Sequence, residues 1–359
     1  MNVAIHTATG KYNWTASIGK MTALALLLLI VFLMDVAFGS VSIPLRNVLD
    51  IMLSGKAENP AWLYIIKEIR IPKAITAVIA GCALPVSGLQ MQTLFRNPLA
   101  SPSILGISAG AGLGVALVML SAGSVTTIYA ISELGISGTW LLLLAGSLGA
   151  AAIMLLILGI SVRIRDNVIM LVVGVMIGNI TLSIISIWQY FSSPEQVKDY
   201  LIWTFGSLGG VTGSQLYLLA TVVAVGLLIA FASSKVLDTL LLGEQYARSM
   251  GLTINNARLL IIGSTSLLAG SVTAFCGPIS FIGIAVPHLA RSLFNTSDHR
   301  VLTPACCLMG TSLMLICDIA SQLPGSNSVL PINVITSLIG SPIVIWIIMS
   351  RNNLKNSFR

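Results

Sequence analysis

The sequence predicts an all-α membrane protein that crosses the bilayer about ten times. Only 9% of its 359 residues are charged, 56% are hydrophobic, and the mean hydropathy is +0.95. A soluble domain carries about 25% charged residues to cover its wet surface. So few charges can instead cover the two ends of a helical bundle whose sides face lipid. Because apolar content alone would also fit a large soluble core, the prediction rests on the lengths of the apolar runs.

Ten apolar segments approach the length of a membrane span. A helix rises 1.5 Å per residue and needs about 20 apolar residues to cross the hydrocarbon core. Five segments are unbroken, near residues 21–38, 140–162, 168–188, 216–232 and 331–349. Five are interrupted by Gly or Pro, near residues 75–93, 104–121, 259–275, 279–293 and 302–323. Since lipid offers the backbone no hydrogen-bond partner, each segment is expected to be helical.

The basic residues predict that both termini lie in the cytoplasm. With ten spans and the N-terminus inside, thirteen basic residues fall inside and six outside, which together make the 19 in the sequence. The inner set is Lys11, Lys20, Arg96, Arg163, Arg165, Lys235, Arg248, Arg258, Arg291, Arg300, Arg351, Lys355 and Arg359, and the outer set is Arg46, Lys56, Lys67, Arg70, Lys73 and Lys198. Because these cations are scattered singly, the net charge of +7 does not indicate a nucleic-acid partner. It indicates contact with membrane lipid.

The sequence lacks the motifs of a catalytic centre. It has no GxxxxGK[ST] phosphate loop, no HExxH pair and no nucleophile elbow, and its only histidines are His6, His288 and His299. The five cysteines lie in apolar segments without zinc-ligand spacing and are expected to be small core residues. We therefore predict no enzymatic activity and no cofactor for this chain. Energy for uphill work would have to come from another chain or from an ion.

One face of the fifth span carries polar side chains at helical spacing. Its members are Asn179, Ser183, Ser186 and Tyr190. Polar side chains do not favour lipid, so this face is expected to point into the bundle, where it either hydrogen-bonds to other helices or lines a wet pathway. The next polar stretch contains a short apolar piece, residues 200–208, expected to be a half-helix at the outer rim. Its Trp203, Gly206 and Ser207 are further pathway candidates.

A stripe of glycines marks the third span. Gly106, Gly110 and Gly114 are four residues apart and fall on one side of a helix, where they predict either close helix packing or direct contact with a substrate. Five spans followed by five more would place equivalent helices in opposite orientations, as in an inverted repeat. Residue identity does not demonstrate that repeat.

Two cations stand at the outer start of the second span. Arg70 and Lys73 lie three residues apart beside Pro72, near the positive end of the helix dipole, which is an unfavourable position for positive charge. A negative partner is expected to compensate. A docking protein, lipid headgroups or the neighbouring Glu68 could supply it.

A short cytoplasmic segment, residues 238–251, follows the sixth span. Asp238 fits an N-cap, Glu244 precedes Arg248 by one helical turn in the favourable order, and Gly251 fits the position just after a helix. The segment predicts one or two helices shorter than the roughly 12–15 residues that an isolated helix needs in water. They therefore need a surface to pack on, either their own bundle or a partner.

Several local strings resemble a known family over nearly the whole chain. They are Arg70-Ile-Pro-Lys73, Gly81 to Gln92, Arg96-Asn97-Pro98-Leu99-Ala100, Ile104-Leu105-Gly106, Trp203 to Leu208, Leu242-Gly243-Glu244, Gly277-Pro278-Ile279, Pro287-His288-Leu289-Ala290-Arg291, Asp298-His299-Arg300, Leu330-Pro331-Ile332 and Gly340-Ser341-Pro342. This pattern resembles the FecCD-type permeases of bacterial ATP-binding-cassette importers for iron–siderophores, haem and cobalamin. Two positions depart from it, because Gln322 and Val329 stand where the family often has Arg and Glu.

The resemblance implies the fold of a cobalamin permease, with ten helices in a bacterial inner membrane and both termini cytoplasmic. It implies a second permease subunit, identical or paralogous, ATPase subunits that bind ATP and magnesium, and a periplasmic binding protein whose glutamates dock on Arg70 and Lys73. The residues implied in ATPase coupling are Asp238, Leu242, Gly243, Glu244, Ala247, Arg248 and Gly251. The residues implied in gating are Arg96, Asn97, Pro98, Gly277, Pro278, Pro287, His288 and Arg291.

These observations lead us to expect a permease that moves an iron–siderophore complex into the cytoplasm by alternating access. Haem and cobalamin remain open as cargo. The alternative of another class is an ion-driven secondary transporter, which would need a partnered carboxylate in mid-bilayer. Asp318 and Asp35 are the intramembrane carboxylates, but both are expected near the outer ends of their spans.

Overall fold

The computed structural model describes residues 14–39, 41, 43–55, 59–121, 138–161, 163–164, 166–322 and 329–349, and all regular structure within these ranges is helical. Seven helical stretches are long and apolar enough to cross a membrane: α1 (Trp14–Ala37), α3 to α4 (Pro60–Leu94), α7 (Gly138–Ser161), α8 (Asn167–Phe191), α10 (Gly213–Ala232), α13 (Ile254–Cys276) and α15 (His299–Ser321). Three shorter apolar helices are α5 (Ile107–Ser121), α14 (Ile282–Phe294) and α16 (Ile332–Met349). Seven and three make the ten predicted spans.

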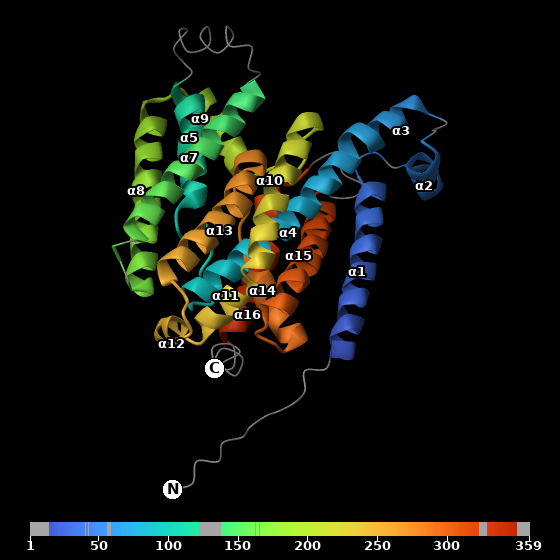
Figure 1. Ribbon diagram of the computed structural model, residues 1–359. Helices are drawn as coiled ribbons and strands as arrows, with labels where there is room; N and C mark the ends of the chain where they lie inside the picture. Colours follow the sequence, from blue (N-terminus) through green and yellow to red (C-terminus); the bar gives the residue numbers. More distant parts are fainter. Residues whose placement is uncertain are drawn as a thin grey trace.

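The second span begins about fifteen residues earlier than the sequence predicted. A continuous helix runs from α3 (Pro60–Tyr64) through a π-helical turn (Ile65–Arg70) into α4 (Ile71–Leu94), visible as one blue rod in Figure 1. The prediction began the span only after Pro72, at residue 75. Within the first turn of α4, however, a proline removes no needed hydrogen bond, and the preceding N–H of Ile71 bonds five residues back to Ile66.

Two breaks at related positions divide helix pairs in the bundle. After α4 the chain takes a positive φ at Arg96 and again at Gly106 before it enters α5. After α13 it does the same at Gly277 and Phe281 before it enters α14. α4 descends from α3 at the top of Figure 1, whereas α13 ascends from α12 at the bottom. Two such units running in opposite directions are what an inverted repeat produces.

The glycine stripe of α5 lies at a helix interface. A Cβ on Gly114 would fall 1.9 Å from the carbonyl oxygen of Ala145, and one on Gly110 would fall 2.6 Å from that of Gly149, so only glycine allows α5 and α7 to approach this closely. Gly106 lies against Gly178 of α8. The packing interpretation of the stripe is therefore correct.

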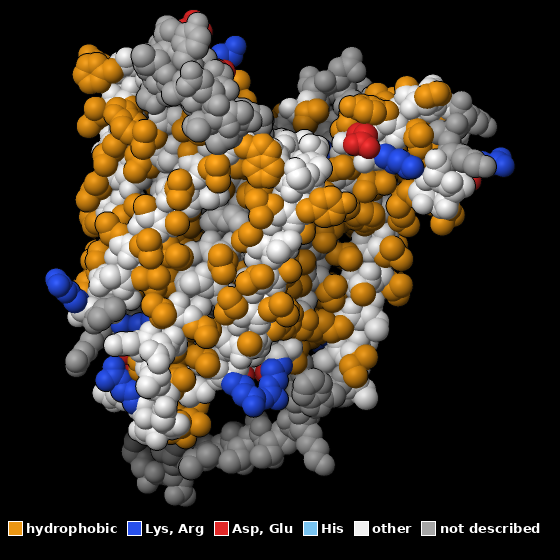
Figure 2. All heavy atoms as spheres, turned by 45° about the horizontal axis from the view of Figure 1, so that its top comes forward, with side chains coloured by type: hydrophobic (Ala, Val, Ile, Leu, Met, Phe, Trp, Pro, Cys, Tyr) orange, Lys and Arg blue, Asp and Glu red, His pale blue; other side chains and the backbone are white. Residues whose placement is uncertain are grey.

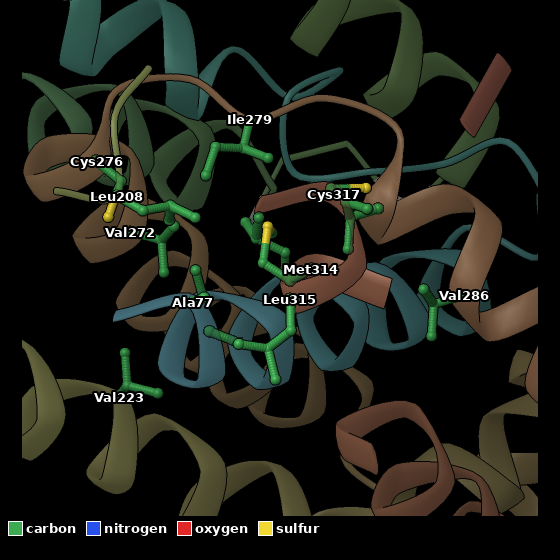
Figure 3. Close-up of a cluster of buried hydrophobic side chains, with 14 of the residues drawn as sticks. Ala77, Leu208, Val223, Val272, Cys276, Ile279, Val286, Met314, Leu315 and Cys317 are labelled. Carbon is green, nitrogen blue, oxygen red and sulfur yellow. The ribbon is translucent and has the colours of Figure 1, made fainter. Parts of the chain in front are cut away.

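The main core lies where α4, α13 and α15 meet. Figure 3 shows Ala77, Val272, Cys276, Met314 and Leu315 gathered there, all nearly inaccessible to solvent. The five cysteines are free, three of them buried and two half-buried, as expected of core residues. Outside, apolar side chains cover the flanks of the molecule in Figure 2, while lysine and arginine gather at the lower end. Such a surface fits lipid on the sides and water at the ends.

The short helices are α2 (Leu45–Ser54), α9 (Pro194–Thr204), α11 (Ser234–Leu241) and α12 (Glu244–Ser249). The predicted rim helix at 200–208 is α9, which begins earlier because Ser193 and Gln196 form a capping box. α1 begins and α16 ends at the end of the bundle that carries α11 and α12 (Figure 1). Both chain ends therefore leave the bundle on one side. Lys11, Lys56, Arg165, Arg351, Lys355 and Arg359 lie outside the described residues.

Candidate coupling and translocation sites

The predicted coupling segment folds into two short helices, α11 and α12, at the lower end of the bundle. Gly243 joins them with a φ of 105°, and Gly251 follows α12 with a φ of 86°, as expected for the residue after a helix. The methyl of Ala247 is fully buried against the bundle. Two short helices were predicted, and the glycines fall at the two ends of α12, but α11 begins at Ser234, four residues before the predicted segment.

Asp238 is not the N-cap that the sequence predicted. It lies inside α11, and its carboxylate accepts hydrogen bonds from the backbone N–H and from Nδ1 of His299, at 3.0 and 2.6 Å. Burial alone would raise the pKa of Asp238, but the hydrogen bonds and charge of His299, with help from Arg300, leave that pKa below its usual value. The Asp238 carboxylate is therefore ionised at neutral pH. Ser233, not Asp238, precedes the first turn of α11.

His299 carries this contact into the bundle. Its ring is fully buried, and its Nε2 lies 2.8 Å from the hydroxyl of Thr93 near the end of α4. Thr93 also donates to the carbonyl of Leu89. A chain of polar contacts therefore joins α11, the start of α15 and the end of α4. Neither the motif Asp298-His299-Arg300 nor the count of three histidines indicated this contact.

Glu244 makes the expected contact with Arg248 and a closer one that the sequence did not indicate. Its carboxylate lies 3.9 Å from the Arg248 guanidinium and 2.7 Å from Nη2 of Arg258 in α13. Arg248 is half exposed, whereas the Arg258 side chain is 2% exposed. The ion pair between Glu244 and the buried Arg258 therefore attaches α12 to α13.

An apolar row on the coupling segment faces away from the bundle. Leu242, Tyr246 and Met250 follow one another at one-turn spacing and are 60%, 56% and 61% exposed. The lower end of the molecule is otherwise rich in cations (Figure 2). Large apolar side chains exposed in a row beyond the membrane-spanning helices mark a surface for a protein partner.

The gating candidates meet at the break after α4. Nε2 of His288 lies 2.8 Å from the carbonyl oxygen of Pro98, and Nη1 of Arg291 donates to Oε1 of Gln92 at 2.8 Å. Gln92 in turn donates to the carbonyl of Ile284. The structure thus brings the predicted residues of α14 together with the loop after α4. A second link is Arg96, whose guanidinium lies beside Gly243 between α11 and α12.

The remaining gating candidates divide between two places. Pro287 lies inside α14, and the Asn97 side chain accepts from the N–H of Leu99 within its own turn. Gly277 packs against the backbone of Trp203 and Gly206 at the outer break, next to Pro278. Gly277 and Pro278 are therefore not near His288, and they belong to the outer site described below.

The structure gives Arg70 and Lys73 partners within this chain that the sequence did not indicate. Arg70 is 7% exposed, and its guanidinium donates to the carbonyls of Val36 and Ala37 at 2.9 and 2.7 Å and to that of Val41. It therefore caps the end of α1. No sequence neighbour could reveal these partners, which lie 29 to 34 residues away.

Lys73 has an internal partner as well. Its Nζ lies 2.9 Å from Oδ1 of Asp318, whose side chain is 1% exposed. The amide of Gln322 donates to the same Asp318 carboxylate at 3.2 Å and reaches Asp35 at 3.5 Å. The negative charge that compensates Lys73 thus comes from this chain. The docking role assigned to Arg70 and Lys73 remains a prediction.

The polar stripe of α8 is exposed, not turned into the bundle. Asn179, Ser183, Ser186 and Tyr190 all face the outside, and the two serine hydroxyls donate to carbonyls of α8 itself. The interhelical hydrogen bonds considered from the sequence are therefore not formed within the described chain. α8 packs against α5 with its other face. The stripe therefore lies on the outer surface of the described chain.

A groove of about 730 Å³ opens between the end of α9, the break before α14 and α16. The described residues that line it are Thr204, Phe205, Pro278, Asn333, Val334, Ser337, Leu338, Ser341 and Pro342. None of these is charged. The predicted pathway residues Trp203, Gly206 and Ser207 lie next to the groove but do not line it. The Trp203 ring stacks on Tyr200, and the N–H of Ser207 donates to the carbonyl of Cys276 at 2.8 Å.

The polar wall of this groove was missed from the sequence. Asn333, Ser337 and Ser341 recur every four residues on α16, the same signal that identified the stripe on α8. Asn333 is also fixed in place, because its side chain accepts from the N–H of Ser280 and its own N–H donates to the carbonyl of Phe205. Within the described part of the chain, no three His, Cys, Asp or Glu side chains are grouped to hold a metal ion.

The comparisons with known proteins agree with this geometry. The FecCD transport family matches residues 27–350. The vitamin B12 import system permease protein BtuC of Klebsiella pneumoniae is 36% identical over 327 residues, which are 91% of this chain and 92% of that protein. BtuC of Escherichia coli O6:H1 is 34% identical over 299 residues, 83% and 87% of the two chains.

Two solved structures share the fold. A metal-chelate type ABC transporter in an inward-facing conformation gives a TM-score of 0.79 at 25% identity and covers 92% of this chain and 99% of that one. PsaBC from Streptococcus pneumoniae, in complex with Fab, gives a TM-score of 0.50 at 17% identity and covers 79% and 92%. The second likeness concerns the fold alone.

Proposed function

Because this chain belongs to the FecCD transport family, we propose that it carries a bulky metal chelate from the periplasm to the cytoplasm, in the first instance a ferric siderophore. Membership makes it a multi-pass permease of an ATP-binding-cassette importer. The cargo and the mechanism of alternating access are the parts we propose.

The observation that carries the cargo class is the uncharged groove beside α16, which is mainly apolar and presents the hydroxyl and amide groups of Thr204, Asn333, Ser337 and Ser341. A free metal ion needs carboxylate, imidazole or thiolate ligands, and none stands among the described residues lining the groove. Hydroxyl and amide groups instead suit the oxygen-rich surface of a metal that is already chelated. The volume of about 730 Å³ lies within the range of pockets that hold small-molecule ligands.

Cobalamin is the second candidate, because the relatives at 36% and 34% identity are named as vitamin B12 permeases. Uptake of labelled chelates separates the two. Cells that carry this permease with its cognate ATPase and binding protein would be supplied with an iron-55 siderophore or with cobalt-57 cobalamin, each against an excess of the other unlabelled. Uptake of iron that cobalamin does not reduce supports the siderophore. Uptake of cobalamin alone, or of free Fe³⁺ or Mn²⁺, contradicts it.

ATP and magnesium are proposed to bind to separate ATPase subunits, and this chain is proposed to hold no cofactor. The partner surface on α12 supports this division, because Leu242, Tyr246 and Met250 are exposed beyond the spans. A second permease subunit, identical or paralogous, is proposed to cover the exposed stripe of α8 and to complete the pathway. The periplasmic binding protein is proposed to dock at the opposite end, near Lys73.

An ion-driven secondary transporter is less well supported. It needs a carboxylate in mid-bilayer, but Asp35 and Asp318 lie within a turn of the outer ends of α1 and α15. Asp318 is already paired with Lys73. The end of the bundle with α11, α12 and most of the described cations is proposed to face the cytoplasm of a bacterial cell, with the chain in the inner membrane.

A further inference from the structure

The guanidinium of Arg258 connects two segments that are distant in the sequence. Arg258 lies near the start of α13, is 2% exposed and is among the largest fully buried side chains. Its Nη2 donates to Oε1 of Glu244 in α12 at 2.7 Å, and its Nη1 donates to the carbonyl oxygen of Ile164 at 2.9 Å. One rigid, planar group thus holds the coupling helix and the segment between α7 and α8 together.

The Ile164 end of this bridge lies directly before α8. Asp166 is the N-cap of α8, and its carboxylate accepts from the N–H groups of Val168 and Ile169 at 2.7 and 3.1 Å. The backbone is therefore held by Arg258 at Ile164 and by its own cap two residues later. Ile164 thus lies only two residues before the capped start of α8, so a displacement of Ile164 acts on the first turn of α8 through a very short length of backbone.

Apolar packing surrounds the bridge on both sides. Ala247 of α12, Ala257 and Ile261 of α13 and Met170 of α8 belong to one buried cluster, with Ile164 at its edge. α8 packs mainly against α5 and touches α7 only lightly. The flank of α8 is thus held by α5, while its lower end approaches α12 and α13 through Met170, Ile164 and the Arg258 bridge.

We propose that Arg258 is a positioning residue that transmits the displacement of α12 to the start of α8. The proposal rests on the proposed function, in which an ATPase moves α12 and α8 borders the pathway. A helix of six residues has little stability of its own, so α12 follows whatever holds it. Separating the charges would leave the buried Arg258 without its carboxylate, which is costly in a region of low dielectric. The ion pair therefore favours joint movement of α12 and Ile164 over separation.

The test uses complexes of the full permease with its cognate ATPase and binding protein in proteoliposomes. Arg258→Met removes the hydrogen bonds to Glu244 and Ile164 but keeps a long side chain. Arg258→Lys keeps the charge, and Glu244→Gln weakens the link to Arg258 and the longer contact with Arg248 but leaves the bond to Ile164 in place. Three quantities are measured for each: affinity for the ATPase, rate of ATP hydrolysis, and cargo imported per ATP. Arg163→Met is the matched control, because Arg163 neighbours Ile164 but is exposed.

Loss of the bridge is expected to lower the cargo imported per ATP by at least about tenfold in Arg258→Met, the factor for one lost hydrogen bond to a charged group. ATPase affinity and hydrolysis should change less than about twofold, a difference too small to represent a lost contact. Arg258→Lys should recover part of the loss. Adding Glu244→Gln to Arg258→Met should have no further effect, because both act through one link. Arg163→Met should match the parent.

A purely structural role would reduce the amount of assembled complex and leave the import per ATP of that complex unchanged. That result, or additive losses in the double variant, would overturn the proposal. If Arg258→Met does not assemble with the ATPase, the Glu244→Gln and Arg258→Lys complexes are compared instead. Their cargo imported per ATP then distinguishes transmission of movement from a purely structural role. Failure of the parent permease to bind an ATPase, or to import cargo with ATP, would count against the proposed function and not against the bridge.

Discussion

The ammonium group of Lys73 lies 2.9 Å from the carboxylate of Asp318 and joins the start of α4 to the end of α15. The two residues are separated by most of the chain, and the Asp318 side chain is 1% exposed. A buried pair of this kind specifies how two helices meet, because either charge left alone is costly.

Lys73→Met should therefore destabilise the protein by about 3–5 kcal/mol, since it leaves Asp318 buried without its counter-ion. The double variant Lys73→Met, Asp318→Leu should regain most of that loss. Thermal unfolding in detergent, followed by near-ultraviolet circular dichroism, measures both. Lys67→Met removes an exposed cation at the same end and should leave the transition unchanged. Equal losses of stability in the single and double variants would show that Lys73 and Asp318 contribute no coupling energy to folding.

The same double variant separates docking from folding. It removes the Lys73 cation without leaving a buried charge, so a stable protein can be tested for binding of the periplasmic protein in nanodiscs. If Lys73 contributes to docking, the association rate should fall, most clearly at low salt, because rim charges act mainly on encounter. If the variant binds the periplasmic protein at low salt with the association rate of the parent, Lys73 has only a structural role.

Arg70→Met should loosen α1 from the bundle. Arg70 donates to three carbonyls at and just after the end of α1, and each group left unpaired costs about 1–3 kcal/mol. Limited proteolysis should cut this variant between α1 and α2 faster than the parent. Lys67→Met again serves as the control. An unchanged cleavage rate would mean that α1 is held by its apolar contacts alone.

The exposed row on α12 should determine affinity for the ATPase. Tyr246 is 56% exposed in the free chain, and Tyr246→Asp replaces its apolar ring with a charge. Loss of an interface anchor costs about 2 kcal/mol or more of binding free energy. We expect the affinity to fall at least about thirtyfold, the equivalent of that energy. Leu53→Asp makes a comparable change on an 86% exposed leucine of α2 and should have no effect. Parent-like affinity in Tyr246→Asp would place the ATPase contact elsewhere.

The depressed pKa of Asp238 gives a pH dependence with a definite sign. A carboxylate whose pKa is lower in the folded state contributes stability above its unfolded value, which is about 4, and loses it as the pH falls through the folded value. The parent should therefore exceed Asp238→Asn in stability at about pH 5, where this carboxylate is still ionised. The margin should shrink below about pH 4. Unfolding midpoints across this range provide the measurement. A margin that already declines near pH 6 would place the titration on another group.

The ten spans could be predicted from the sequence because each depends only on local apolar length. The coupling helices could be predicted for a similar reason, since Gly243 and Gly251 mark their ends locally. Arg258 could not be identified, because its partners Ile164 and Glu244 lie 94 and 14 residues away. Arg70 was misjudged for the same reason, since its neighbours in the chain reveal nothing of the carbonyls at the end of α1.

The polar stripes show what a local pattern does and does not determine. Asn179, Ser183 and Ser186 were recognised as one face of α8, but spacing alone does not tell whether a polar face turns inward or outward. Asn333, Ser337 and Ser341 carry the same spacing on α16 and could have been found by the same reasoning. Their place on a groove with Thr204 and Pro278 depends on the break before α14, which the sequence indicates only by its glycine and proline.

This permease is proposed to import a metal chelate with energy supplied by a separate ATPase. The most direct measurement is chelate uptake into proteoliposomes that contain the permease, its cognate ATPase and its binding protein, with ATP present or absent on the ATPase side. We predict uptake only when all three proteins and ATP are present, unchanged by ionophores that abolish proton and sodium gradients. Uptake by the permease alone, driven by an ion gradient and indifferent to ATP, would contradict the account.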